Sequence, residues 1–160
     1  MNRHKGARGA TLRAAAVAAG VLAADQASKA LVRASVGRME RIDVLPGIDL
    51  VNTRNTGIAF GFLDGGGTLV AVVAALALVA LLAFFATHLG RRLVWLPTGL
   101  LVGGAAGNLV DRAREGSVTD FVDLPLWPAF NLADAAITIG VLSLLYVLEG
   151  PPSRGPGRRS

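Results

Sequence analysis

Four stretches of mostly apolar residues, separated by shorter polar segments, dominate the sequence. An α-helix needs about 20 predominantly apolar residues to cross the hydrocarbon core of a bilayer. The stretch 68–89 meets this criterion along its whole length, since it contains no Asp, Glu, Lys or Arg. The stretches 12–32, 93–110 and 131–148 meet it except near one end, where each carries polar side chains. The pattern predicts an all-α membrane protein with four transmembrane helices over these ranges.

The composition agrees with a membrane protein and limits the chemistry that the chain can perform. Of its 160 residues, 52% are hydrophobic and 17% are charged, and the mean hydropathy of +0.53 is more apolar than that of a typical soluble domain. The absence of cysteine excludes disulfides, thiolate metal sites and thiol nucleophiles. Two isolated histidines, His4 and His88, leave little basis for a histidine metal site or a serine–histidine hydrolase. We therefore expect no metal and no cofactor, and chemistry based on carboxylates, amides and the backbone.

The positive charge lies mainly in the terminal segments and in short loops. The formal net charge is +5, and Lys and Arg are concentrated in 3–13, at 91–92 and in 154–159. This distribution, with only 6% aromatic residues, argues against nucleic-acid binding, which needs a basic groove with stacking side chains. The excess of Lys and Arg on the side of the two termini predicts that both termini are cytoplasmic. The polar ends of the first, third and fourth helices then all fall at the outer face of the membrane.

The segment 35–63 has the pattern of short strands instead of a helix. Turn signals at Pro46-Gly47 and at 55–57 separate short stretches in which β-branched residues are common. We therefore expect a small extracytoplasmic β-rich cradle in this segment.

The rest of the chain divides into a membrane domain and two tails. We expect a basic cytoplasmic tail over 1–11, one integral membrane domain over 12–149 and a disordered cytoplasmic tail over 150–160. One alternative stays open at the N-terminus, because a basic stretch followed by apolar and then small residues also describes a cleavable signal peptide.

Two of the expected helices carry polar side chains at helical spacing. Asp25 and Lys29 lie four residues apart and share one face of the first helix, in the order that favours an ion pair. They either neutralise each other at the membrane interface or orient other groups. Gly104, Asn108 and Arg112 share a face of the third helix. This face is either a packing seam between helices or a thin surface that admits a peptide or lipid backbone, with the amide and the guanidinium supplying hydrogen bonds.

Two aspartates are the main candidates for catalysis. Asp134 lies inside an apolar stretch, and a carboxylate within the membrane indicates a functional site. Asp120 lies in the preceding outer loop among apolar residues. Two carboxylates brought close share one proton, so that one takes a proton from water while the other donates to a carbonyl oxygen, as in aspartic proteases. The alternative is that a loop aspartate is a solvated turn residue, which we expect for Asp123.

Five short sequence blocks occur along the chain in a fixed order. They are DQASK at 25–29, NTGIAF at 55–60, GGAAGNLVDR at 103–112, VTDF at 118–121 and FNLAD at 130–134. Each block alone is weak, but the ordered set is specific and resembles the bacterial lipoprotein signal peptidases, also called signal peptidase II. The departures from the family pattern are small: Ile58 stands where a small residue is common, and Thr119 where an aliphatic residue is common.

The resemblance implies a four-helix protein of the bacterial cytoplasmic membrane with an extracytoplasmic β-rich cradle and an active site near the outer face. It implies an aspartic endopeptidase that removes the signal peptide from prolipoproteins just before a cysteine that carries a diacylglyceryl group. The expected partners are these modified precursors and membrane lipids, and we expect the protein to act as a monomer. The residues that match family motifs are the catalytic pair Asp120 and Asp134, the substrate-binding residues Asn55, Gly104, Asn108, Arg112 and Asn131, and the supporting residues Asp25, Lys29 and Asp111.

Two other classes of function stay open on the residues alone. A small proton-coupled transporter would depend on Asp134 and be indifferent to Asp120. A non-catalytic membrane scaffold would lose only stability when both acids are replaced. The clustering of polar residues at one face, with no acid or amide path to the inner side, counts against the transporter.

Overall fold

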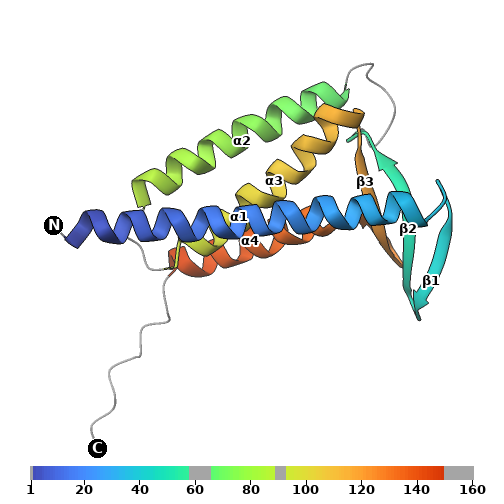
Figure 1. Cartoon of the computed structure of the whole chain (residues 1–160), viewed down its shortest axis with the longest axis horizontal. Helices are drawn as coiled ribbons and strands as arrows, with labels where there is room; N and C mark the ends of the chain where they lie inside the picture. Colours follow the sequence, from blue (N-terminus) through green and yellow to red (C-terminus); the bar gives the residue numbers. More distant parts are fainter. Residues whose placement is uncertain (1, 58–65, 89–92, 150–160) are drawn as a thin grey trace, which may run out of the picture.

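The computed structural model describes residues 2–57, 66–88 and 93–149, which form a helical bundle with a small antiparallel sheet at one end (Figure 1). The helices and strands, in chain order, are α1 (Asn2–Ser35), β1 (Arg41–Leu45), β2 (Ile48–Asn55), α2 (Gly66–His88), α3 (Trp95–Glu115), β3 (Val118–Leu124), β4 (Trp127–Phe130) and α4 (Leu132–Glu149). The strands pair in the order β1-β2-β3-β4. The mainly helical fold with a small sheet is the class that the sequence predicts.

Helix α3 is the centre of the bundle, since it packs against α1, α2 and α4. A small core of Ala14, Phe85 and Val94 lies where these helices meet, near the end away from the sheet. The other end, where β3 follows α3 and the sheet lies across the helix ends, holds the buried charged and amide side chains of Asp25, Lys29, Asn108, Asp111, Asp120 and Asn131. The bundle therefore separates an apolar end from a polar end, and the polar end carries the site.

Glycines on α3 allow its close contact with the neighbouring helices. A Cβ atom built on Gly103 would lie 2.7 Å from the backbone oxygen of Ala18 in α1. A Cβ atom on Gly104 would lie 2.6 Å from the backbone oxygen of Ala133 in α4. Gly104 therefore packs closely against α4, and the expectation that its face admits a substrate backbone stays a prediction.

Replacing Gly103 with alanine should therefore destabilise the protein by about 1–3 kcal/mol, because α1 and α3 must move apart. The matched control is Gly20→Ala in α1, where a new Cβ atom meets no other atom within 4 Å. That replacement should stabilise the helix by about 0.5–1 kcal/mol. Thermal unfolding of both purified variants in detergent tests this, and equal effects would contradict the packing argument.

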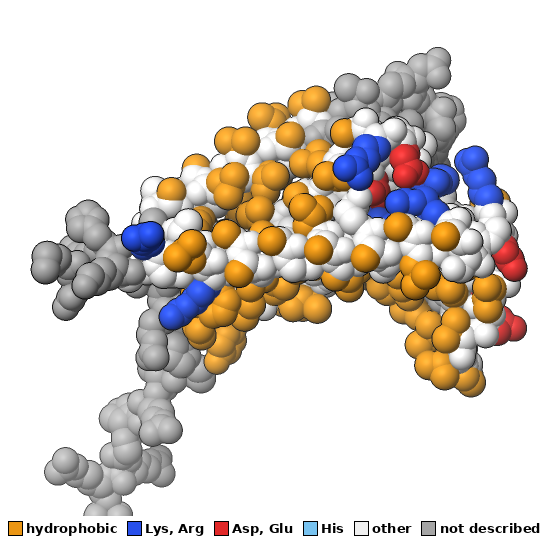
Figure 2. All heavy atoms as spheres, viewed as in Figure 1, with side chains coloured by type: hydrophobic (Ala, Val, Ile, Leu, Met, Phe, Trp, Pro, Cys, Tyr) orange, Lys and Arg blue, Asp and Glu red, His pale blue; other side chains and the backbone are white. Residues whose placement is uncertain are grey.

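Much of the outer surface of the helices is apolar and exposed, as Figure 2 shows for one side of the molecule. The exposed residues on α2 and α4 include Val72, Leu76, Val79, Ile139, Leu142, Leu145 and Tyr146. By length and composition, Gly6–Ser35 of α1 and all of α4 are able to cross a membrane, and Val72–His88 is a shorter apolar helix. A surface of this kind suits a lipid environment.

Two helices extend beyond the expected ranges. Helix α1 begins at Asn2, so the residues of the expected tail over 1–11 are helical from that point; no proline interrupts them, and they continue the long apolar helix that follows. Helix α3 continues past residue 110 to Glu115 and ends where Gly116 adopts a left-handed conformation with a φ of 68°. The buried carboxylate of Asp111 is tolerated in this last part of the helix because it forms an ion pair with Lys29 on α1.

The sheet is larger than the expected cradle over 35–63. Strands β3 and β4 supply its second half, and Asp120 lies in β3 instead of in a loop. Our expectation that Asp123 is a solvated turn residue is also wrong, since it lies in β3 and forms an ion pair with Arg41. The prolines at 125 and 128 argue against strands in the sequence pattern. Pro128 is nevertheless tolerated in β4, because β4 lies at the edge of the sheet. Ile58, the rest of the cradle to residue 63 and the tail over 150–160 lie outside the described residues.

Candidate active site

Asn131 links the two candidate catalytic aspartates. It precedes α4 and caps it, since its side-chain oxygen accepts a hydrogen bond from the backbone N–H of Asp134 at 3.0 Å. In return, Asp134 Oδ2 accepts a hydrogen bond from the backbone N–H of Asn131 at 3.2 Å, which completes a capping box. The Asn131 side-chain amide also donates to Asp120 Oδ1 at 2.6 Å. One fully buried residue therefore touches both carboxylates and holds them near each other.

Asp120 is held by amides from two sides. Besides the bond from Asn131, its Oδ2 accepts a hydrogen bond from the side-chain amide of Asn55 at 2.9 Å. Asn55 lies at the end of β2, and its own oxygen accepts a hydrogen bond from the backbone N–H of Gly57 at 2.7 Å. This contact orients the Asn55 amide so that its N–H₂ group faces the carboxylate. The sheet therefore brings Asn55 and Asp120 together across paired strands.

Asp134 is held by an amide from α3. Asn108 donates from Nδ2 to Asp134 Oδ1 at 2.8 Å. Lys29 donates to the oxygen of the same amide at 2.9 Å. Because a lysine ammonium is only a donor, this contact fixes which side of the Asn108 amide faces Asp134.

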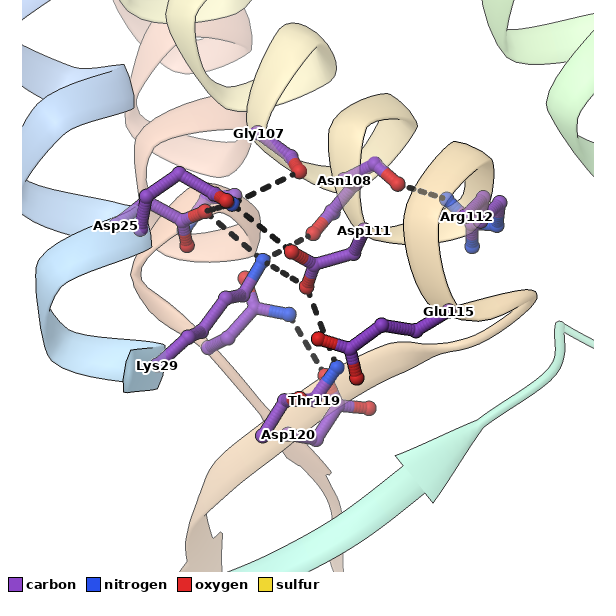
Figure 3. Close-up of polar contacts among 12 residues, drawn as sticks. Asp25, Lys29, Gly107, Asn108, Asp111, Arg112, Glu115, Thr119 and Asp120 are labelled. Carbon is purple, nitrogen blue, oxygen red and sulfur yellow. Dashed lines mark hydrogen bonds and ion pairs between the residues drawn. The ribbon is translucent and has the colours of Figure 1, made fainter. Parts of the chain in front are cut away.

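Lys29 is the centre of a buried charge cluster that joins α1 to α3 (Figure 3). Its ammonium lies 2.9 Å from Asp25 and 3.0 Å from Asp111, and all three side chains are buried. Asp25 also accepts a hydrogen bond at 3.0 Å from the backbone N–H of Ala133 in α4. Asp111 accepts one at 3.3 Å from the backbone N–H of Thr119 in β3. The cluster therefore fixes the elements that carry both aspartates, and α1 is needed for it, which argues against a cleavable signal peptide.

A second polar cluster, which the sequence did not indicate, ties the sheet to the helices. Glu115 at the end of α3 forms ion pairs with Arg33 of α1, at 3.4 Å, and with Arg54 of β2. The buried hydroxyl of Thr119 accepts hydrogen bonds from Arg33 at 3.1 Å and from Arg54 at 2.9 Å. Thr119 stands where the family often has an aliphatic residue, and its hydroxyl therefore has a structural role beside Asp120. No spacing rule connects these residues, because they come from four separate elements.

Arg112 has few partners for a partly buried cation. Its Nη1 donates to the backbone oxygen of Asn108, one turn earlier in α3, at a long 3.4 Å. Within the described part of the chain, its buried Nε has no hydrogen-bond partner. Among the described residues, the guanidinium therefore has only a long contact at Nη1 and an unpaired, buried Nε.

Burial raises the pKa of the Asp120 carboxyl, because the charged form loses its hydration. The hydrogen bonds from Asn55 and Asn131 oppose this rise, and the negative charge of Asp134 adds to it. Asp120 therefore keeps its proton to a higher pH than an aspartic acid in water.

A mainly apolar cavity of about 530 Å³ opens beside Asp134, between β4 and α4. Its lining residues are Leu124, Trp127, Pro128, Ala129, Phe130, Asp134, Ala135, Thr138 and Ile139. An extended or lipid-like apolar group fits a cavity of this size and lining. Access to Asp134 therefore lies on the side of the bundle where α4 meets the sheet.

These features define a small helical protein with an apolar surface and two linked carboxylates where its helices meet a sheet. A family model described as signal peptidase (SPase) II matches residues 17–149. The lipoprotein signal peptidase of Halothermothrix orenii is 39% identical over 129 residues, which cover 80% of this chain and 89% of the relative. That of Nitrobacter hamburgensis is 42% identical over 158 residues, which cover 89% and 94%. A solved structure described as a bacterial membrane enzyme, determined by the in meso method, aligns with a TM-score of 0.79 at 30% identity, covering 84% of this chain and 91% of that chain.

The chain belongs to the signal peptidase II family, which confirms the family that the sequence blocks resemble. It is therefore a signal peptidase of the bacterial inner membrane. The alternative of a proton-coupled transporter is not supported.

Proposed function

We propose that this protein removes signal peptides from prolipoproteins by aspartic catalysis, with Asp120 and Asp134 acting on one water molecule. The observation that supports this most directly is the double contact of Asn131, which bonds to both carboxylates. The cut falls before the cysteine that carries a diacylglyceryl group, as the family resemblance implies. The apolar cavity beside Asp134 suits a precursor that enters from the lipid.

In the proposed reaction, Asp120 holds the proton shared by the pair. Asp134 takes a proton from the water, and the resulting hydroxide attacks the scissile carbonyl carbon. Asp120 donates its proton to the carbonyl oxygen. When the tetrahedral intermediate collapses, Asp134 gives its proton to the nitrogen of the modified cysteine and the C–N bond breaks. Asp120 takes a proton from one hydroxyl of the intermediate, which becomes the new carboxyl group, and the pair returns to its singly protonated state. All proton transfers use these two carboxyls, so the reaction needs no metal and no cofactor.

The surrounding polar residues divide into two groups in this proposal. Asn55, Asn108 and Asn131 orient the carboxyls. Asn55 is exposed and contacts the substrate backbone directly in this proposal, whereas Asn108 and Asn131 are buried and act on the substrate through the carboxyls. Arg112 is only partly buried, and we assign to its terminal Nη groups, not to the buried Nε, a hydrogen bond to a carbonyl of the substrate. The supporting group consists of Asp25, Lys29, Asp111 and Gly104.

We further propose that all four helices cross the membrane, with both termini in the cytoplasm and the sheet outside. The start of α1 and the end of α4 lie at the end of the bundle opposite the sheet (Figure 1). The positive-inside rule then puts the basic start of α1 in the cytoplasm. The active site accordingly lies near the extracytoplasmic face.

The proposal is tested by incubating the purified protein with a precursor that carries or lacks the diacylglyceryl group. We expect release of the signal peptide, detected by mass spectrometry, from the modified precursor and not from the unmodified one. Cleavage at another bond, or equal cleavage of both precursors, would contradict the proposed substrate.

The rate of cleavage should fall as the pH rises through the pKa of Asp120. The sign follows because Asp120 acts as the acid, so loss of its proton removes the donor, and burial moves that loss to higher pH. A pH–rate profile of the purified enzyme measures this fall. Asp123→Asn, on the same strand but paired with Arg41, should leave the profile unchanged. A rate that rises steadily with pH would contradict the assignment of the proton to Asp120.

A further inference from the structure

One row of residues across the sheet is entirely apolar. The strand register pairs Ile42 with Leu50, Leu50 with Val122, and Val122 with Phe130. Paired residues on neighbouring strands point to the same face of a sheet. The row therefore gives one face an apolar stripe across all four strands.

The next row lies on the opposite face and is acidic. Asp43 pairs with Asp49, and Asp49 pairs with Asp123. Arg41, two residues before Asp43 and therefore on the same face, forms ion pairs with Asp49 and Asp123. Charged and apolar side chains are thus separated on the two faces of the sheet.

The apolar face is the one turned towards the helices. Asp120 and Val122 are two residues apart in β3, and the extra residue of the register shift beside them lies in β2, between Leu50 and Thr53, so we take the two side chains to point to the same face. Asp120 contacts Asn131 at the start of α4, which places this face on the helix side. In a chain whose helices cross the bilayer, the face turned towards the helix ends is also the face turned towards the lipid.

Two hairpin turns, residues 44–48 and 124–128, form the end of the sheet that projects beyond the bundle, and we call them the hairpin tips. They are neighbours, since a Cβ atom on Gly47 would lie 3.7 Å from Pro125. Leu126 is 105% exposed, Trp127 65% and Leu45 60%. Figure 2 shows hydrophobic side chains gathered on this projecting end, with acidic side chains on the outer edge.

We propose that the hairpin tips dock into the outer leaflet of the bilayer, at the boundary between headgroups and acyl chains. This rests on the proposed orientation of the helices. The tips expose Leu45, Leu126 and Trp127 to solvent. Leu126 and Trp127 also line a pocket with the charged row of Arg41, Asp49 and Asp123. The tips therefore lie where the apolar and the charged surfaces of the sheet meet, as suits a segment at the level of the headgroups. A tryptophan beside leucines is typical of this boundary, because its ring is apolar and its N–H is polar. Docking fixes the level of Asp120 relative to the lipid that holds the substrate.

The first test uses Trp127 as a reporter in vesicles. The chain has two tryptophans, so Trp95→Phe leaves Trp127 as the sole emitter. In phosphatidylcholine vesicles we expect blue-shifted emission, strong quenching by bromine atoms placed near the start of the acyl chains, and iodide quenching severalfold weaker than that of N-acetyltryptophanamide. The proposal would be overturned if the emission maximum of Trp127 and its quenching by iodide matched those of N-acetyltryptophanamide in water. No cleavage is measured, so this result is independent of the proposed catalysis.

The second test compares two variants in the same Trp95→Phe background. Leu126→Glu puts a charge on a tip, whereas Met39→Glu puts one on a residue outside the tips that is 77% exposed. The two positions have nearly the same left-handed φ, 63° and 64°. We expect severalfold stronger iodide quenching of Trp127 for the first variant and no change for the second. Equal quenching in both would overturn the proposal, and if Leu126→Glu fails to fold, the first test decides alone.

Discussion

Replacing Asp120 or Asp134 with asparagine should lower the rate of precursor cleavage by about 10²–10⁴-fold, the usual contribution of a general acid or base. Asparagine keeps the size of the side chain but neither accepts a proton from water nor donates one to a carbonyl oxygen. The measurement is the initial rate of signal-peptide release from a diacylglyceryl-modified precursor in proteoliposomes.

The same strand provides a matched control for this loss. Asp123→Asn removes a carboxylate three residues from Asp120, on the outer face, where it pairs with the exposed Arg41. The Arg41 side chain is 58% exposed, so this ion pair contributes little to stability, and the variant should cleave at the rate of the unchanged protein. Substantial activity in either the Asp120 or the Asp134 variant, while the protein still inserts, would reject the catalytic pair.

The helices were predictable because their signal is continuous along the chain. The apolar stretches 68–89 and 131–148 lie within one or two residues of α2 and α4. Strands β3 and β4 were not predictable, because they are short and depend on pairing with β2, which is distant in the sequence. The hydrophobic pattern therefore gave the bundle but only half of the sheet.

The site shows the same division between local and tertiary signals. The pairing of Asp25 with Lys29 follows from their spacing on one helix, and the structure places them 2.9 Å apart. The ion pairs of Glu115 follow from no such spacing, since α1, β2 and α3 meet there only in the folded chain. For Gly104 the local pattern is ambiguous, because a small residue on a helix face is compatible both with substrate entry and with helix packing. Only the position of the neighbouring helix shows which contacts the residue makes.

Replacing Lys29 with methionine should destabilise the protein by about 3–5 kcal/mol, the usual cost of removing one partner of a buried ion pair. Methionine fills a similar volume but leaves Asp25 and Asp111 buried beside each other without their cation. Thermal unfolding in detergent measures the loss. Arg38→Met removes an exposed cation near the end of α1 and should change stability by less than about 0.5 kcal/mol.

A double variant separates the two roles of Lys29. Adding Asp111→Asn to Lys29→Met removes one of the two facing carboxylates, so part of the lost stability should return. Cleavage should stay low, because no ammonium then holds the oxygen of Asn108 and the amide is free to turn its donor away from Asp134. If cleavage recovers in parallel with stability, Lys29 acts only by stabilising the fold. If stability recovers while the rate of cleavage does not, Lys29 also sets the hydrogen bond that Asp134 receives.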